Sequence, residues 1–238
     1  MTEKEDRNHP AVSRSELWRI SESPQKFRYF KDNPEEPTPA LLFGQVFHKL
    51  ALGPETFDAE FIVAPEVNRR TNAGKQAWAD FLEEHADKTI IPVEMYAQAR
   101  EMCDALYAVP FAKKLLNGSR EVPFFWTDET TGEACKCRAD CLNTNYSQPI
   151  IVDVKSAADA STEAFSRDAI KYGYDFQAAM YSEGVTLGIQ QKPLFVFIVV
   201  EKNPPYAVNI LQADELLLRR GHNLLRELIG IYHDCKQT

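Results

Sequence analysis

The chain of 238 residues has no long apolar run, few cysteines and fewer basic than acidic residues, and each of these shortages argues against a class of protein. No stretch approaches the roughly 18–20 apolar residues of a membrane-spanning helix, and the charged start MTEKEDRNHP does not resemble a signal peptide, so we expect a cytoplasmic protein with no membrane partner. Five cysteines are an odd number, which fits free thiols in a reducing compartment rather than disulfides. Basic residues are outnumbered 27 to 35 by acidic ones, and the formal charge of −8 argues against a general polyanion-binding protein.

What is present is an ordinary globular composition, 44% apolar and 26% charged, at a length that favours one compact domain. We expect the polar residues 1–12 to be disordered and residues 13–238 to form this domain. Up to residue 117 the apolar spacing is mainly helical. The capping box at Ser13 predicts where the first helix begins, and further helices are expected at 23–30, 38–52, 73–86 and 92–117, with a short strand at 59–64 and a break at Pro110.

The pattern becomes sheet-forming in residues 118–238. Strands are expected at 120–127, 133–143, 149–155, 194–200 and 206–211, and helices at 161–170, 174–188 and 213–234. This order predicts an α/β (α+β) fold in which a sheet is flanked by helices and preceded by an N-terminal helical extension.

The strand expected at 149–155 carries charge in an apolar setting. Because side chains alternate along a strand, Asp153 and Lys155 share one face, while Ile150, Val152 and Val154 share the other. Unpaired buried charges cost several kcal/mol, so this pair needs a metal ion or another partner. The alternative is a structural Asp–Lys pair at a strand edge.

An acid on the preceding strand changes the interpretation. Arg138 and Asp140 share one face of the strand at 133–143. If the two strands pair, Asp140 and Asp153 converge, and a cation such as Mg²⁺ or Mn²⁺ would relieve the repulsion between the two carboxylates. Glu121, at the start of the first strand, either joins such a site or is a surface acid.

Four short motifs in this order resemble those of the PD-(D/E)xK nucleases: Gly44-x-x-x-His48, Arg138-Ala139-Asp140, Asp153-x-Lys155-Ser156 and Gln177-x-x-x-Tyr181. Within that superfamily the chain resembles the branch of lambda exonuclease and the RecB nuclease domain, and most of all the C-terminal nuclease domain of RecE (exonuclease VIII). The resemblance spans about residues 13–211. It implies a restriction-endonuclease-like core with a central mixed β-sheet.

The resemblance also implies roles for individual residues. His48, Asp140, Asp153 and the Val154 carbonyl would ligate one or two Mg²⁺ or Mn²⁺ ions, and Lys155 would orient or activate the attacking water. Without the motif, a histidine at position 48 would be read as a surface or core residue.

Further catalytic roles follow for Glu121, Gln177 and Tyr181. Gln177 and Tyr181 are one helical turn apart and would support the site or hold the DNA backbone; Tyr181 is otherwise a packing residue. The cysteines lack the spacing of the iron–sulfur cluster that some RecB-like nucleases carry, so no cluster is expected.

The activity implied is that of a Mg²⁺-dependent deoxyribonuclease, an exonuclease acting 5′→3′ on linear double-stranded DNA ends in phage-type recombination. A single-strand annealing protein and a homo-oligomeric ring are the implied partner and assembly. Two alternatives stay open: an endonuclease or repair nuclease with another substrate, and a non-catalytic DNA-binding or assembly protein that keeps the fold.

Because the net charge is negative, any DNA-binding surface must be local. The candidates are two arginines of the basic N-terminal segment, two in a loop near residue 70 and one on the strand at 133–143: Arg14, Arg28, Arg69, Arg70 and Arg138. Solvated surface charge is the alternative for each of them.

Overall fold

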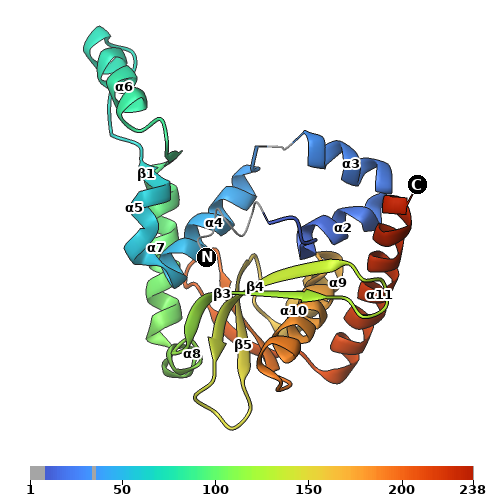
Figure 1. Ribbon diagram of the computed structural model, residues 1–238. Coiled ribbons are helices and arrows are strands. Elements are labelled where there is room, and N and C mark those ends of the chain that lie inside the picture. Colours follow the sequence, from blue (N-terminus) through green and yellow to red (C-terminus); the bar gives the residue numbers. More distant parts are fainter. Residues whose placement is uncertain (1–8, 34–35, 238) are drawn as a thin grey trace.

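A five-stranded mixed sheet forms the centre of the molecule in the computed structural model, which describes residues 9–33 and 36–237 (Figure 1). Its strands follow one another in chain order: β3 (Ser119–Thr127), β4 (Ala134–Asn143), β5 (Ile150–Ala157), β6 (Leu194–Glu201) and β7 (Val208–Gln212). β5 and β6 are parallel, and the other neighbours are antiparallel. The predicted fold class, a mixed sheet flanked by helices, is confirmed.

Helices cover both faces of this sheet. One face carries α4 (Pro39–Leu52), α7 (Val93–Ala108) and α8 (Pro110–Leu115), and the other carries α9 (Thr162–Lys171), α10 (Tyr174–Ile189) and α11 (Glu215–Gln237). Alternation divides β5 between two cores: Val152 and Val154 pack with α4 and α7, whereas Ile151 packs with α9 and α10. β6 is divided between the same two cores, which explains why it is almost continuously apolar in sequence.

The N-terminal helices α2 (Arg14–Glu22) and α3 (Pro24–Asp32) lie beside α11. Ser13 forms the predicted capping box with Glu16. The structure differs from the expected disorder at Ala11 and Val12, which are buried, and Val12 forms a parallel bridge with Cys135 of β4. Residues 1–8 lie outside the described residues.

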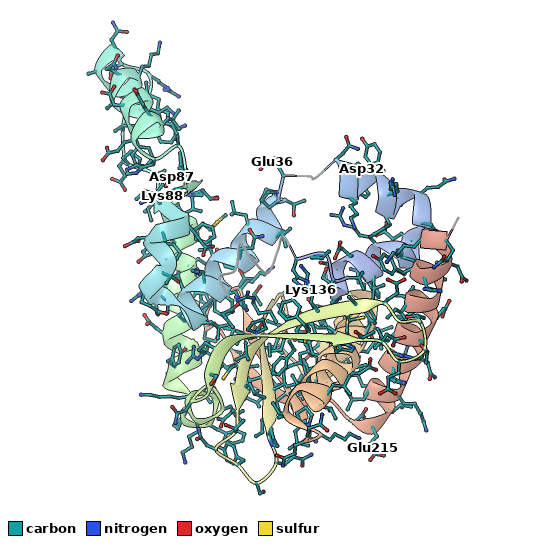
Figure 2. The ribbon with its side chains drawn as sticks, in the orientation of Figure 1. Asp32, Glu36, Asp87, Lys88, Lys136 and Glu215 are labelled. Carbon is teal, nitrogen blue, oxygen red and sulfur yellow. The ribbon has the colours of Figure 1, made fainter. Side chains whose placement is uncertain are left out.

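An arm that the sequence did not predict interrupts the helical half. It is built from β1 (Phe61–Val63), α6 (Asn72–Glu84) and β2 (Thr89–Ile91), and the short helices η1 (Pro54–Thr56) and α5 (Phe57–Glu60) precede it. The strand expected at 59–64 is β1, but its parallel partner β2 was missed because three residues are too few to show a period. Figure 2 labels Asp87 and Lys88 where the arm meets the body.

The helix expected at 92–117 is two helices, α7 and α8, and Pro110 begins the second. Proline fits the first turn of a helix, where its missing N–H would have no partner. Among the helices of the described residues, none has both the length and the hydropathy needed to cross a membrane.

Candidate metal centre

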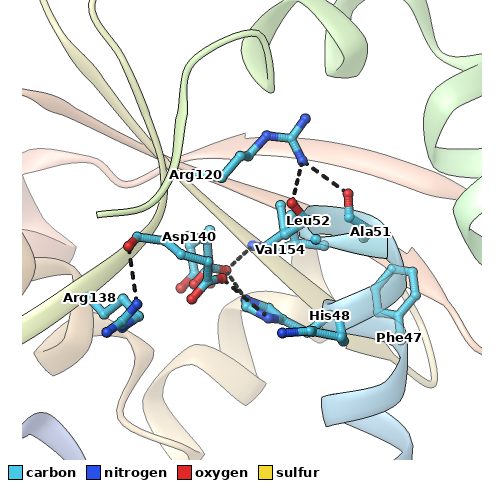
Figure 3. A network of polar contacts seen from close by, with 12 residues as sticks. Phe47, His48, Ala51, Leu52, Arg120, Arg138, Asp140 and Val154 are labelled. Carbon is cyan, nitrogen blue, oxygen red and sulfur yellow. Dashed lines mark hydrogen bonds and ion pairs between the residues drawn. The ribbon is translucent and has the colours of Figure 1, made fainter. Parts of the chain in front are cut away.

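The site begins where β4 and β5 separate. The last backbone pair of this ladder toward the site joins Cys141 to Val152, and beyond it the Val154 N–H donates to Asp140 Oδ2 over 2.9 Å (Figure 3). The carboxylate thus replaces a backbone acceptor and is itself fixed at the edge of β5. This confirms that Asp140 reaches β5.

His48 reaches the same carboxylate from α4. Its Nε2 lies 3.0 Å from Asp140 Oδ2, and its Nδ1 lies 3.7 Å from Glu121 Oε1. One ligand atom from each of these three residues lies within 4.8 Å of the others. Carboxylate oxygens and an imidazole nitrogen suit a divalent cation, so the donor set fits the metal centre that the motifs imply.

Arg120 fixes the position of α4 against β3. Its Nη1 donates to the carbonyl oxygens of Ala51 and Leu52, 3.0 and 3.4 Å away, at the C-terminal end of α4 (Figure 3). A cation at this end satisfies carbonyls that have no partner within the helix. Sequence reasoning missed Arg120, although it directly precedes the predicted Glu121.

Glu121 has a left-handed backbone, with φ of 52°, near the start of β3. The ladder pairs Arg120 and Val122 with residues of β4 but passes over Glu121, whose carbonyl accepts from Arg138 Nη1 at 3.3 Å. A positive φ in a residue with a side chain costs of order 1–3 kcal/mol and is concentrated at functional sites. The observation favours the site role of Glu121 over the surface one.

Asp153 is buried beside this group rather than within it. Its Oδ1 accepts from Gln177 Nε2 at 2.5 Å, and Lys155 Nζ lies 2.5 Å from its Oδ2, which accepts no hydrogen bond. A buried carboxylate oxygen held only by an ion pair retains the capacity to bind a cation. The structure therefore brings together His48, Glu121 and Asp140, while Asp153 and the Val154 carbonyl stay predicted ligands.

The titration of these groups follows from burial and charge. Burial lowers the pKa of His48, but the carboxylates of Asp140 and Glu121 outweigh it and raise the pKa to about 9. Burial raises the pKa of Asp153 to about 6, against the opposing effect of Lys155. Without a metal, His48 is thus protonated at neutral pH, and a cation that it ligates must displace that proton.

A pocket of about 280 Å³ lies next to the site. Its lining comes from the start of α2, three consecutive residues of β4 and the first turns of α10: Ser13, Arg14, Ser15, Lys136, Cys137, Arg138, Gln177 and Tyr181. Figure 2 shows Lys136 between the sheet and α2. Gln177 links pocket and metal centre, because it also holds Asp153.

The five predicted DNA-binding arginines fall into three places. Arg14 and Arg138 line the pocket, and Arg14 Nη2 donates to the Gly173 carbonyl at 2.9 Å. Arg28 is an exposed residue of α3 paired with Asp32, and Arg69 and Arg70 lie on the arm. Sequence reasoning missed Ser13 and Lys136 as pocket residues, because the serine was assigned only a capping role.

The position of Tyr181 is compatible with both of its predicted roles, support of the site and packing in the core. It lines the pocket, and it also packs against the cores formed with α9 and α11. Burial raises the pKa of its hydroxyl well above its usual range, so it stays protonated. Cys135 and Cys141 are buried, as expected of small core residues.

Comparisons with known proteins bear on this geometry. A solved protein from Eubacterium rectale, described as "Putative exonuclease", matches with a TM-score of 0.63 over 97% of this chain and 87% of that chain. At 16% sequence identity, this match shows a shared fold alone. A second structure, SSO0001, matches with a TM-score of 0.43 and 12% identity over 96% and 81% of the two chains. No curated protein matches significantly. The family described as "PDDEXK-like domain of unknown function (DUF3799)" matches residues 13–238, and the chain therefore belongs to this family of PDDEXK-like domains.

Proposed function

We propose that the protein is a metal-dependent deoxyribonuclease that removes nucleotides 5′→3′ from the ends of linear double-stranded DNA, as RecE-type enzymes do. One observation carries the proposal: Gln177 lines the basic pocket and also bonds the buried Asp153, which lies beside the acidic centre of His48, Glu121 and Asp140. Family membership and the fold shared with the Eubacterium rectale protein support a nuclease.

Each residue of the centre has its own role in the proposed phosphodiester hydrolysis. A bound Mg²⁺ or Mn²⁺ would polarise the phosphate and lower the pKa of an attacking water. His48, Glu121 and Asp140 would hold the cation, and the buried Asp153 would add negative charge beside it. Lys155 stays protonated, because the nearby carboxylates outweigh the lowering of its pKa by burial, and its ammonium stabilises the charge that develops on the phosphate.

The pocket supports an exonuclease with a preference for a phosphorylated 5′ end. A terminal phosphate monoester carries about 1.5–2 negative charges at neutral pH, whereas each diester carries one. Three cations line the pocket: Arg14, Lys136 and Arg138. They favour the more highly charged terminal group, which would place the first diester of that strand near the metal centre.

The test compares three end-labelled substrates in Mg²⁺: a linear duplex with 5′-phosphate, the same duplex with 5′-hydroxyl, and a covalently closed circle. We expect digestion from the phosphorylated end, slower digestion of the hydroxyl end and none of the circle. Asp153→Asn keeps the shape of the side chain but removes its charge, and should abolish digestion. Cutting of the circle would identify an endonuclease instead.

The non-catalytic alternative makes the opposite prediction. If the chain only binds DNA, Asp153→Ala and Lys155→Ala leave its measurable activities unchanged, and calorimetry detects no binding of Mg²⁺. The proposed role in phage-type recombination rests on the RecE resemblance. It adds a single-strand annealing partner and a ring of identical subunits, for which a monomer mass in light scattering would be contrary evidence.

A further inference from the structure

The arm is a separate structural unit that stands away from the sheet. β1 and β2 form its base next to α5 and α7, and α6 forms its outer part (Figure 1). Gly74 is the one buried residue of α6. A helix so little used in the core needs another explanation for its presence.

The end of the arm is held by its own contacts. The Arg69 guanidinium lies 3.4 Å from the centroid of the Trp78 ring, and Trp78 stacks on Phe81 with centroids 5.6 Å apart. The loop before α6 packs so closely that a Cβ on Gly74 would lie 2.0 Å from the Asn68 carbonyl oxygen. These contacts cover much of the aromatic face of α6, so what the arm offers to a partner is mainly polar.

Charge is distributed unevenly along this unit. Residues 67–79 contain three cations and no acid: Arg69, Arg70 and Lys75. Within residues 9–33 and 36–237, none of the three forms an ion pair, whereas Arg28 and Arg167 pair with acids on their own helices. The acids of the arm lie on either side of this stretch: Glu66 before it, and Asp80, Glu83, Glu84 and Asp87 after it.

We propose that the outer end of the arm docks on the phosphate backbone of duplex DNA, away from the cleaved end. The proposal deepens the proposed function and rests on it. Cations at the N-terminal end of a helix attract phosphate, and the positive end of the helix dipole adds to this attraction. A duplex offers about one phosphate charge per 1.7 Å of its axis, and this dense array matches the three closely spaced cations; a second copy of this acidic chain is the other occupant with complementary charge, and the oligomeric mass measured below separates the two.

The length of the arm determines which substrates can reach it. The 13 residues of α6 span about 20 Å at 1.5 Å per residue. At 3.4 Å per base pair this corresponds to roughly six base pairs of duplex. Only a duplex that continues well beyond the cleaved end would touch the arm, so its contribution should depend on substrate length.

The experiment uses a double charge reversal, Arg70→Glu with Lys75→Glu, which leaves the contact of Arg69 with Trp78 in place. Its matched control reverses two exposed cations of α8 and α11, Lys113→Glu with Arg219→Glu. Binding of 40-base-pair and 6-base-pair duplexes is measured over a salt series in an Asp153→Asn background, and digestion is measured with Asp153 restored.

We expect the arm variant to bind the long duplex at least ten-fold more weakly, and to lower the slope of log affinity against log salt by about 1.8, because each lost phosphate contact removes about 0.9. The short duplex and the control variant should behave like the parent protein. Equal loss on both duplex lengths, or no loss, overturns the proposal.

Two outcomes separate this proposal from the proposed function. If the parent protein binds the long duplex through the arm but never digests it, the nuclease fails and the docking surface stands. If it digests DNA and the arm variant does so equally well at every length, the docking surface fails. A change of oligomeric mass in the arm variant with unchanged binding would assign the surface to a second copy and overturn the proposal.

Discussion

Replacing Tyr174 by leucine tests how the proposed catalytic lysine is held. Lys155 Nζ lies over the Tyr174 ring, 4.9 Å from its centroid, and the face of an aromatic ring attracts a cation. The ring itself is fixed by stacking on Phe165, with centroids 5.7 Å apart and planes at 22°. Tyr174 begins α10, the helix that also supplies Gln177. It therefore positions the ammonium rather than contacting the substrate.

The size of the effect follows from burial. The Lys155 side chain is 18% exposed, and a largely desolvated cation–π contact contributes about 2 kcal/mol. Loss of that amount from the transition state slows the reaction about 30-fold. Tyr174→Leu should reduce the single-turnover rate on end-labelled duplex by this factor, with DNA affinity unchanged, while Tyr174→Phe keeps the ring face and should stay within about three-fold of the parent rate.

The control for this experiment is the thermal unfolding of both variants, since leucine also changes the packing around Phe165. The reasoning is refuted if Tyr174→Leu is as fast as the parent protein. It is also refuted if Tyr174→Phe is as slow as Tyr174→Leu, because the hydroxyl rather than the ring face would then be the active feature.

Three further predictions concern stability and metal binding. Burial raises the pKa of Asp128, but hydrogen bonds from neighbouring groups, including Thr130 and Arg226, outweigh it and lower the pKa to about 2. The Asp128 charge therefore stabilises the fold by about 2 kcal/mol above pH 4, and this contribution is lost as the pH falls toward 2. Urea unfolding of Asp128→Asn should show a flatter pH dependence over that range, and an unchanged dependence would contradict the assignment. In α11, Gly221→Ala should destabilise strongly, because its Cβ would lie 2.0 Å from the Asp175 carbonyl oxygen in the first turn of α10. Gly230→Ala in α11 meets nothing within 4 Å and should raise the free energy of unfolding by about 0.5–1 kcal/mol, so equal melting temperatures of the two variants would refute the packing. In urea unfolding, Mg²⁺ at 100 times its dissociation constant should raise the free energy of unfolding of the parent protein by about 2.7 kcal/mol, but not that of Asp140→Asn. An equal rise in both proteins would place the ion elsewhere.

The periodicity of apolar residues was sufficient to predict the helices and strands that bury one apolar face over several turns or residues. On α4, which the apolar spacing predicted at 38–52, Phe43, Val46, Phe47 and Leu50 are buried, and His48 lies off this face beside Asp140. Alternation also predicted that Asp140 would meet β5. These features follow from local sequence because a single face, repeated over many residues, determines each of them.

The remaining features depend on contacts between distant segments. The positive φ of Glu121 has no signal in a strand-like sequence, and it lies beside Arg120, which is bonded to the end of α4. The pocket joins Arg14 to Gln177 across more than 160 positions, and no periodic pattern relates two such segments. The approach of Gln177 to Asp153 follows from how α10 packs on the sheet.

The net charge of −8 is a poor guide to the field that a phosphate meets at this site. The three acids of the region are Glu121, Asp140 and Asp153. Five groups oppose them: Lys155, His48, whose pKa is raised to about 9, and the pocket cations Arg14, Lys136 and Arg138. Positive groups therefore outnumber the carboxylates locally before any metal binds, and a divalent cation that displaces the His48 proton increases the excess by one charge. The acidic surplus lies elsewhere on the chain, and under the proposed function it would repel DNA from surfaces outside the metal centre and the pocket.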